Sequence, residues 1–457
     1  MPQYLSLKLV SGLINIPSSV ILNALLHAGY RTTGVRDVKV NIEDVNALIR
    51  ARKIAYKFNA ASSARKKNHA ICLPPSKRTN ITAIDLFSGA GGWSCGLEMA
   101  GLSVVGAIDH DRCASETHKV NFPSCETICS DITTFSPKDL EKRVGENIDV
   151  IVGSPPCQTF STLGHGKMAS LGIDLKGDIR NYYYKAYVDY VRHFRPKIFV
   201  MENVPGFATK HNGDIFKDFC GLLGGDKGYR LAHTIVKTEE YGIPQKRRRL
   251  IVVGFRIDLQ IAKQKNPIEV LCPPENIRKH VTVSEAVGDL PDIVDDWRID
   301  EMPYSVKKCQ SGYQALLRNE GLTVRNNICR ISNPLAKEMF KFLAPGQRYS
   351  DLSRKTRANL KFLSSFKSEI IKTRCRRLPL NEPSWTVIAH IGMDGYEYIH
   401  PNANRTLSVR EAARLQSFPD WFVFCGNMRQ QYVQVGNAVP PLLAYSIATK
   451  IKELVSG

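Results

Sequence analysis

The sequence has no long apolar run and no pattern of paired cysteines. No segment approaches the roughly 20 uninterrupted apolar residues that a membrane helix needs. Residues 1–19 also lack the basic start and the small-residue cleavage site of a secretory signal. The 12 cysteines include no paired C-x-x-C spacing, so neither a zinc site nor a disulfide framework is indicated. We expect a cytoplasmic protein with reduced thiols, no metal and no membrane partner.

Acidic residues are scarce in two regions, and both regions are therefore strongly basic. Residues 1–80 contain 13 lysines and arginines against 3 acids, and residues 321–380 contain 14 against 3. The formal net charge of the chain is +20, so the remainder is nearly neutral. A neutral body with two basic appendages favours nucleic acid as the partner, and a solvated basic surface is the alternative.

From residue 81 onward, the pattern alternates between strands and helices. Strands are predicted over residues 81–87, 103–109, 148–153, 197–204 and 247–255, and helices over residues 91–101, 112–122, 182–194 and 214–223. The helix over residues 182–194 places Tyr184, Tyr187, Val188, Val191 and Phe194 on one face. This alternation predicts an α/β fold with a mainly parallel sheet covered by helices on both sides.

The alternation stops between about residues 256 and 380, where the sequence is patchy, basic and rich in turn signals. We predict a catalytic domain over residues 81–256, an inserted smaller α+β domain over residues 257–380, and completion of the first domain over residues 381–457, with helices over 408–418 and 440–455. Residues 1–80 are a separate basic extension with helices predicted over 18–30 and 41–58. The extension is either a small DNA-binding or autoregulatory module or a positioning arm.

Three strand ends carry residues suited to a nucleoside. The first is "DLFSGAGG", where Gly89 and Gly91 let the backbone approach a ligand. Position 94 is Ser where the dinucleotide fingerprint has its third glycine, which disfavours a pyrophosphate ligand. Asp109 ends the next strand, and Asp131 ends a third segment. Each acid alone is more typical of a cap or turn, but three such strand ends in order predict a nucleoside pocket.

Three further strand ends carry groups that could act in catalysis. Cys157 lies in "GSPPCQTFS", where two prolines end the preceding strand. A lone cysteine is usually a small core residue. Glu202 stands at the end of the apolar strand in "MENV", where a carboxyl group could hold or share a proton. Arg247, Arg248 and Arg249 enter another strand. Together they indicate a nucleophile with an acid partner.

The chain resembles the DNA (cytosine-5) methyltransferase family. The motifs "DLFSGAGG", "GSPPCQTFS", "MENV", "QKRRR", "RTLSVREAARLQSFP" and "QVGNAVPP" occur in the family's order, over about residues 81–256 and 375–457. The resemblance implies a Rossmann-like sheet, S-adenosyl-L-methionine as methyl donor and a cytosine flipped out of double-stranded DNA as acceptor. The insert then corresponds to the family's target recognition domain.

The resemblance also implies a role for each matching residue. Cys157 would be the nucleophile, Glu202 would hold the base, and Arg249 with Arg247 would orient it. The cofactor residues implied are Phe87, Gly89, Gly91, Asp109, Asp131, Ile132, Pro156 and Asn437. His110 departs from the family, which often has a larger aromatic or apolar residue there. The loop after Cys157 would close over the flipped nucleotide, with Ser161 as a DNA contact.

Two alternatives remain open. An RNA (tRNA) cytosine-5 methyltransferase uses the same scaffold, but the resemblance implies a smaller recognition region for that branch, so a basic insert of about 120 residues favours DNA. A catalytically silent DNA-binding homologue would not need Cys157, Glu202 and Arg249. We expect a monomeric, nucleoid-associated modification enzyme, with or without a cognate restriction endonuclease as genetic partner. Basic insert residues, Arg325, Arg330, Arg348, Arg354, Lys355 and Arg357 among them, would divide between phosphate and base contacts.

Overall fold

A computed structural model shows the architecture of the chain. It describes residues 79–156, 183–260, 262, 266–272, 279–293, 300–304, 309–318, 323–360 and 375–456, together with the strands Tyr4–Ser6 and Lys39–Asn41. The chain divides into a unit over Met1–Ala70 and a unit over Ile71–Gly457. In the first unit, β1 (Tyr4–Ser6) pairs antiparallel with β2 (Lys39–Asn41). The helices predicted over residues 18–30 and 41–58 lie outside the described residues, apart from Asn41 in β2.

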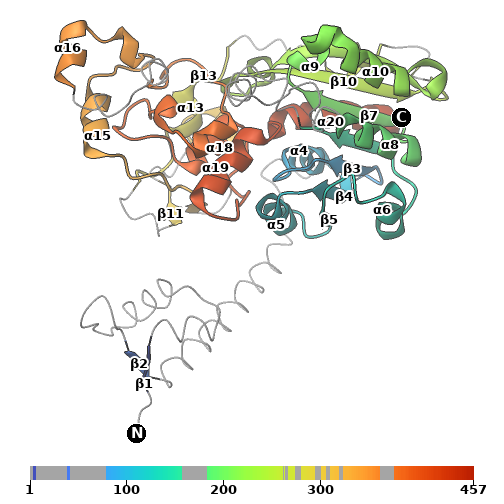
Figure 1. The fold of residues 1–457 in the computed structure, drawn as a ribbon, viewed down its shortest axis with the longest axis horizontal. Helices are drawn as coiled ribbons and strands as arrows, with labels where there is room; N and C mark the ends of the chain where they lie inside the picture. The colour runs from blue at the N-terminus through green and yellow to red at the C-terminus, as the bar shows by residue number, and fades with distance from the viewer. Residues whose placement is uncertain are drawn as a thin grey trace. The chain divides into compact units, whose positions relative to one another are not determined.

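A seven-stranded sheet forms the centre of the second unit (Figure 1), in the order β5-β4-β3-β6-β7-β10-β8. Its strands are β3 (Thr82–Leu86), β4 (Ser103–Asp109), β5 (Glu126–Cys129), β6 (Val150–Gly153), β7 (Ile198–Asn203), β8 (Tyr229–Lys237) and β10 (Arg248–Arg256). The strands β3 to β7 pair in parallel, whereas β10 is antiparallel to both β7 and β8. The predicted α/β fold with a mainly parallel sheet is confirmed.

Short strands lie outside this sheet. They are β9 (Gln245–Lys246), β11 (Glu301–Pro303), β12 (Thr323–Arg325) and β13 (Ser384–Trp385). The strands β9 and β13 pair in parallel, and β11 pairs antiparallel with β12. The β9–β13 pairing joins the start of the "QKRRR" segment to the chain that returns from the insert.

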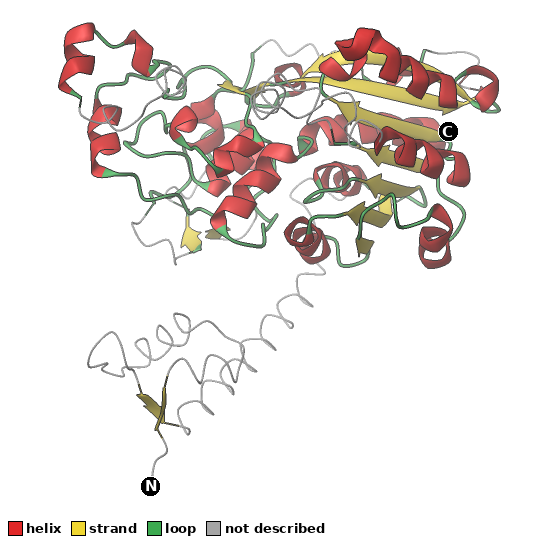
Figure 2. Cartoon of the chain, in the orientation of Figure 1, coloured by secondary structure: helices red, strands yellow, loops and turns green. Residues whose placement is uncertain are grey.

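Helices cover both faces of the large sheet (Figure 2). The α-helices are α4 (Gly92–Ala100), α5 (Arg112–Asn121), α6 (Pro137–Val144), α8 (Tyr183–Phe194), α9 (Gly206–Thr209), α10 (Asp214–Leu223), α12 (Pro267–Leu271), α13 (Val283–Val287), α14 (Gly312–Leu317), α15 (Pro334–Lys341), α16 (Arg354–Asn359), α18 (Val409–Leu415), α19 (Met428–Asn437) and α20 (Pro441–Ser456). The 3-10 helices are η3 (Lys210–Gly213), η4 (Gly225–Lys227), η5 (Thr238–Tyr241), η6 (Tyr349–Asp351), η8 (Ala389–Gly392) and η9 (Tyr396–Tyr398).

Alternate residues of the strands feed two cores. Val150 and Val152 of β6 join the core that contains α4 and α20, whereas Ile151 joins the core that contains α8 and α10. This division follows from side chains that point to opposite faces along a strand. All five residues predicted on one face of α8 are buried, so that prediction is confirmed.

Glycine in α4 allows a very close approach of α20. A Cβ atom added at Gly96 would lie 2.4 Å from the Cβ of Ala444 and 2.6 Å from the carbonyl oxygen of Pro441. The C-terminal helix therefore packs beside the first helix of the domain. This contact brings the last segment of the chain to the Gly-rich turn at the start of α4.

The described part of the predicted insert contributes to two cores. Val283 of α13 and Tyr313 of α14 are buried in the core that contains α4 and α20. Phe340 of α15 belongs instead to a small separate core that includes Cys375 and Ile399. The predicted boundaries of the insert, residues 257–380, stay a prediction, but its first part shares the core of the catalytic domain.

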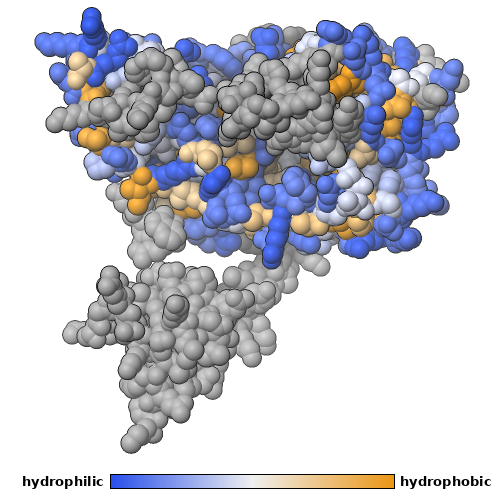
Figure 3. All heavy atoms as spheres, in the orientation of Figure 1, coloured by the Kyte–Doolittle hydropathy of each residue, from blue (hydrophilic) through white to orange (hydrophobic). Residues whose placement is uncertain are grey.

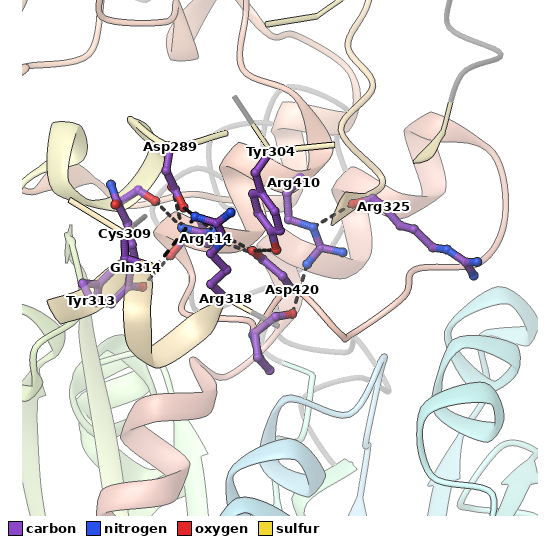
Figure 4. A network of polar contacts seen from close by, with 12 residues as sticks. Asp289, Tyr304, Cys309, Tyr313, Gln314, Arg318, Arg325, Arg410, Arg414 and Asp420 are labelled. Carbon is purple, nitrogen blue, oxygen red and sulfur yellow. Dashed lines mark hydrogen bonds and ion pairs between the residues drawn. The ribbon is translucent and has the colours of Figure 1, made fainter. Parts of the chain in front are cut away.

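A buried ionic network fastens that first part to α18 (Figure 4). The Arg414 guanidinium is 2.6 Å from Asp420 through Nε and 3.1 Å from Asp289 through Nη1. The Tyr304 hydroxyl donates to the other Asp420 oxygen at 2.7 Å, and the Arg318 guanidinium stacks 3.8 Å over the Tyr304 ring. Because each buried charge has an opposite partner, the network holds the segment without leaving an unpaired charge.

The face of the described residues seen in Figure 3 is mainly hydrophilic, with apolar side chains in small groups. None of the helices in the described part of the chain has the length and apolar character needed to span a lipid bilayer.

Candidate active site

The carboxyl ends of the parallel strands gather the predicted site residues along one edge of the sheet. The turn after β3 carries Phe87 to Gly91, and β4 ends at Asp109. The chain leaves β6 as Ser154–Pro156, and Glu202 is the penultimate residue of β7. Because β10 is antiparallel to β7, with Leu250 opposite Asn203, its first residues reach the same edge.

Glu202 and Arg249 form the clearest pair at this edge. Arg249 Nε lies 2.7 Å from Glu202 Oε1, and both side chains are mostly buried. A guanidinium beside a carboxylate fixes the position of both groups, and Arg249 Nη1 also donates to the Arg248 carbonyl oxygen at 2.7 Å. The sequence predicted the two residues at one site, and the structure brings them together.

The loop that leads to Cys157 is tied to the same edge. The Asn203 side-chain amide donates to the carbonyl oxygen of Pro155 at 3.3 Å, and the Trp93 indole N–H donates to the Ser154 hydroxyl at 3.2 Å. Cys157, Ser161 and the predicted closing loop lie outside the described residues. The described segment that precedes Cys157 ends at Pro156, next to β7, the strand that carries Glu202.

A hydrogen bond joins the Gly-rich turn to Asp109 at this edge of the sheet. Asp109 accepts hydrogen bonds from the backbone N–H groups of Gly89 and Asp111, each at 2.8 Å. A carboxylate has about four acceptor positions, so Asp109 can accept hydrogen bonds beyond these two. Burial raises the pKa of Asp109, and the two N–H donors oppose that rise.

The turn itself offers room and an unused polar group. Gly89 has φ +53° and would meet no atom within 4 Å if it carried a Cβ. The Ser88 hydroxyl is buried and has no hydrogen-bond partner among the described residues. A buried hydroxyl without a partner is costly unless a ligand supplies one. The turn therefore fits a polar ligand at the position predicted for the cofactor.

A second set of predicted residues comprises Phe87, Asp131 and Ile132, for which the resemblance implied contacts with adenine. The Phe87 ring, on a backbone with φ +56°, meets the Tyr183 ring edge-on at 6.0 Å between centroids. Asp131 accepts from the Thr133 backbone N–H at 2.9 Å, which is the largest cause that lowers its pKa. Ile132 is buried beside it. The side chain of His110 is 74% exposed, and its Nδ1 lies 3.6 Å from an Asp109 carboxylate oxygen.

Arg247 and Asn437 lie at the junction with the C-terminal segment. Arg247 is buried, and its guanidinium donates to three backbone carbonyl groups, including that of Val387 at 2.7 Å. Burial lowers its pKa. Asn437 is exposed at the end of α19. Arg247 lies close enough to Arg249 and Glu202 for their charges to act on it. It has no ion pair of its own among the described residues.

A buried polar chain supports the Gly-rich turn from below. Asp85 accepts from the Ser94 hydroxyl at 2.7 Å, Ser94 bonds His118 Nε2 at 2.9 Å, and His118 Nδ1 bonds Thr127 at 2.8 Å. Burial raises the pKa of Asp85 to about 7 and lowers that of His118 to about 3. The chain joins β3, α4, α5 and β5 around the cofactor side of the sheet.

A separate hollow of about 490 Å³ lies between α14 and α20 and is lined in part by Tyr313 and Tyr445. None of the predicted site residues lines it, and its residues carry no catalytic pair, so we place the site at the strand ends. Within the described residues, no group of three or more His, Cys, Asp or Glu side chains is arranged to hold a metal ion.

Comparison with known proteins identifies the family. The family model for C-5 cytosine-specific DNA methylases matches residues 81–453. The chain belongs to this family. The Type II methyltransferase M.DdeI of Desulfomicrobium norvegicum is 33% identical over 384 residues, which cover 81% of this chain and 88% of M.DdeI. The Type II methyltransferase M.AgeI of Thalassovita gelatinovora is 31% identical, with 82% of this chain and all of M.AgeI covered.

A solved structure supports the fold. A putative DNA modification methyltransferase encoded within a prophage of E. coli superposes with a TM-score of 0.65 and 27% identity, covering 83% of this chain and all of that chain. The family match includes both halves of the sheet domain and the insert between them, so the methylase fold here spans the site from the Gly-rich turn to α20.

The structure also places residues at the site that the sequence analysis did not single out. Trp93 and Asn203 hold the loop before Cys157, Tyr183 contacts Phe87, and Ser88 faces the turn with an unpartnered hydroxyl. Asn203 directly follows Glu202 in "MENV", and Tyr183 lies in a run of three tyrosines. Those two positions carried a signal, whereas the contacts of Trp93 and Ser88 required the fold.

Proposed function

We propose that this DNA methylase transfers a methyl group from S-adenosyl-L-methionine to carbon 5 of a cytosine through a transient bond from Cys157. The observation that carries the proposal is the Glu202–Arg249 pair, 2.7 Å apart, at the strand edge where the loop to Cys157 begins, in a chain of the C-5 cytosine-specific family.

The cofactor would occupy the pocket at the Gly-rich turn. Asp109 would accept from the ribose hydroxyls, Phe87 would face the adenine, and Asp131 with Ile132 would meet its edge. Pro156 would form the wall, and Asn437 would contact the methionine end. When bound, S-adenosylmethionine supplies a methyl group on a positively charged sulfur. The open Gly89 turn and the unpartnered Ser88 hydroxyl support this fit.

The acceptor ring is activated by the side chains of this chain. Cytosine must leave the duplex to reach them, at a cost of a few kcal/mol. The Cys157 thiolate would add to carbon 6, and the electrons of the 5,6 double bond would make carbon 5 nucleophilic. Glu202 would hold N3 and share a proton there, and Arg249 would hold O2, so that negative charge does not accumulate.

Carbon 5 would then take the methyl group while the bond from methyl to sulfur breaks. Loss of the carbon 5 proton to a base would restore the double bond and expel the cysteine, which returns the enzyme to its starting state. The resemblance of the chain to Type II methyltransferases supports a role as the modification enzyme of a restriction-modification system, acting on the nucleoid DNA of the cytoplasm.

The decisive experiment uses labelled S-adenosylmethionine with duplex DNA, or with RNA of matching sequence, carrying 5-fluorocytosine. Fluorine cannot leave as the proton does, so a covalent complex accumulates. We expect a complex with DNA that is absent from the Cys157→Ala variant. Methyl transfer that survives Cys157→Ala would overturn the mechanism, and a complex with RNA alone would favour the RNA alternative. Sequencing methylated cytosines in host DNA after expression would identify the target.

A further inference from the structure

The buried arginine of the "QKRRR" segment bonds to the backbone on both sides of Asn437. The Arg247 Nη2 group donates to the carbonyl oxygens of Gly436 and Ala438, each at 3.3 Å. Its Nη1 group donates to Val387 at 2.7 Å. The side chain is 2% exposed, so these bonds are protected from water and have no solvent substitute.

The neighbouring contacts show that this junction is tightly packed. The Gln416 side-chain amide donates to the same Ala438 carbonyl at 2.6 Å. A Cβ atom added at Gly436 would lie 2.3 Å from the backbone nitrogen of Ala389. Asn437 is therefore the exposed residue between two residues whose carbonyl groups are both held. The donors that hold the Gly436 and Ala438 carbonyl groups therefore fix the backbone position of Asn437.

The three consecutive arginines have different surroundings. Arg249 pairs with Glu202, Arg247 binds carbonyl groups of the C-terminal segment, and Arg248 is exposed. Arg247 lies between β9 (Gln245–Lys246) and β10 (Arg248–Arg256), and its side chain is buried, whereas that of Arg248 is exposed. Arg247 thus stands between the pair that would hold the base and the residue that would hold the cofactor.

We propose that Arg247 is a positioning residue, which sets Asn437 at the cofactor site and does not itself contact the cytosine. The inference rests on the proposed function, in which Asn437 contacts the methionine end of S-adenosylmethionine. It replaces the direct role in orienting the base that the family resemblance implied for Arg247. A lysine at 247 keeps the charge but has one head group, which cannot reach carbonyls on both sides of Asn437.

The test measures S-adenosylmethionine binding to the full chain without DNA, by calorimetry, together with KM and kcat on duplex DNA. For Arg247→Lys we expect the Kd and KM for S-adenosylmethionine to rise about tenfold, within the range of couplings between contacting residues, while kcat at saturating cofactor stays within about threefold. Arg248→Met, on the exposed neighbour, is the matched control and should leave cofactor binding unchanged.

A double-mutant cycle with Asn437→Ala shows whether Arg247 acts through Asn437. In the Asn437→Ala background, Arg247→Lys should weaken cofactor binding by less than twofold. Additive effects would overturn the inference. So would an unchanged cofactor Kd with a large fall in kcat, which indicates contact with the base.

Thermal melting establishes that each variant is folded at the assay temperature. If Arg247→Lys is not, Gln416→Met removes the other donor to Ala438 and should raise the cofactor Kd by a similar factor; an unchanged Kd there would equally overturn the inference. Failure of the unaltered chain to bind S-adenosylmethionine would instead refute the proposed function.

Discussion

At the scale of single residues, two carboxyl groups have contrasting environments. Glu202 lies at the end of its strand with a guanidinium beside it, whereas Asp85 lies inside β3, where the Ser94 hydroxyl and backbone N–H are its donors. One oxygen of Asp85 has no partner among the described residues. In the proposed mechanism the first carboxyl group holds the base, whereas the ionisation of the second changes the stability of the fold with pH.

Replacing Glu202 by Gln should lower kcat at least about 100-fold, because an amide cannot share the proton at N3 as a carboxyl group can. Binding of duplex DNA should change little. Glu382→Gln is the matched control, since Glu382 also pairs at 2.7 Å with a cation of this region, Lys246, but is 63% exposed. Steady-state methylation decides the matter: turnover of Glu202→Gln within tenfold of the parent would contradict the assigned role.

Asp85→Asn should stabilise the protein relative to the parent increasingly as pH rises from 5 to 8. Burial raises the pKa of Asp85 from 3.8 to about 7, so the native state keeps a proton that the unfolded chain has already released. That contribution to stability is full below pH 4 and is lost as pH rises through 7. Asparagine has no charge to bury, so its melting temperature should gain a few degrees on the parent over this range.

The comparison isolates Asp85 because other groups are common to both proteins. Burial lowers the pKa of His118 to about 3, so below pH 6.5 the unfolded chain binds a proton that the native state does not. The stability of the fold therefore falls as pH falls in this range, and this effect is present in both proteins. Asp139→Asn is the control: a hydrogen bond from Lys142 lowers the pKa of this exposed carboxyl, so its effect should be constant from pH 5 to 8. Melting curves for Asp85→Asn that parallel those of the parent at every pH would refute the prediction.

The sequence predicted the members of the site better than their contacts. Glu202 and Arg249 could be placed together because both lie near the ends of strands that were predicted in one sheet. The acceptors of Arg247 could not be predicted, because Gly436 and Ala438 are distant in sequence and accept through backbone oxygens, which leave no mark on residue type. The role of Cys157 stays a prediction.

At the scale of elements, the contact between α4 and α20 depends on one small residue. Gly96→Ala should destabilise the fold by roughly 1–3 kcal/mol, because its Cβ would fall 2.4 Å from the Cβ of Ala444 and 2.5 Å from the backbone nitrogen of Tyr445. Gly221→Ala in α10 is the matched control, since a Cβ there meets nothing within 4 Å. That variant should gain up to about 1 kcal/mol of stability.

Denaturant unfolding of the two alanine variants checks the signs. Opposite signs are expected for the same substitution in the middle of two helices, so helix propensity alone cannot account for the result. Equal gains in stability would mean that α4 and α20 do not pack as closely as the structure shows.

Several elements with an apolar period were predicted, whereas others were missed. The helix over residues 214–223 is observed as α10. The strand β8 was missed, as was the reversed direction of β10, whose buried run from Leu250 to Phe255 reads the same in either direction. The helix α19 was missed because polar side chains, Gln431 and Gln434, fill buried positions of its inner face. The helix predicted over 408–418 ends early, at Leu415, and Ser417 follows with φ +66°.

At the scale of the whole molecule, charge is distributed between separate units. The unit over Met1–Ala70 contains 11 lysines and arginines against 3 acids, and the family match begins only at residue 81. The part of the chain that carries the chemistry is therefore distinct from one of its two basic regions. Lysine and arginine bound to phosphate release counterions, so their contribution can be read from the dependence of affinity on salt.

A chain that begins at Ile71 should still methylate duplex DNA, but its affinity should depend less steeply on salt than that of the full chain. Each phosphate contact adds about 0.9 to the steepness of the slope of log K against log salt. The loss of even two contacts is therefore measurable by titration in about 50 to 200 mM KCl, a range over which the affinity of a protein with about six or more contacts falls strongly.

Replacing Arg65, Lys66 and Lys67 by Gln in the full chain keeps its length and should produce part of the same change. If both altered proteins gave the parent's slope, the basic extension would not contact DNA phosphates, and its charge would serve the positioning arm or autoregulatory role instead.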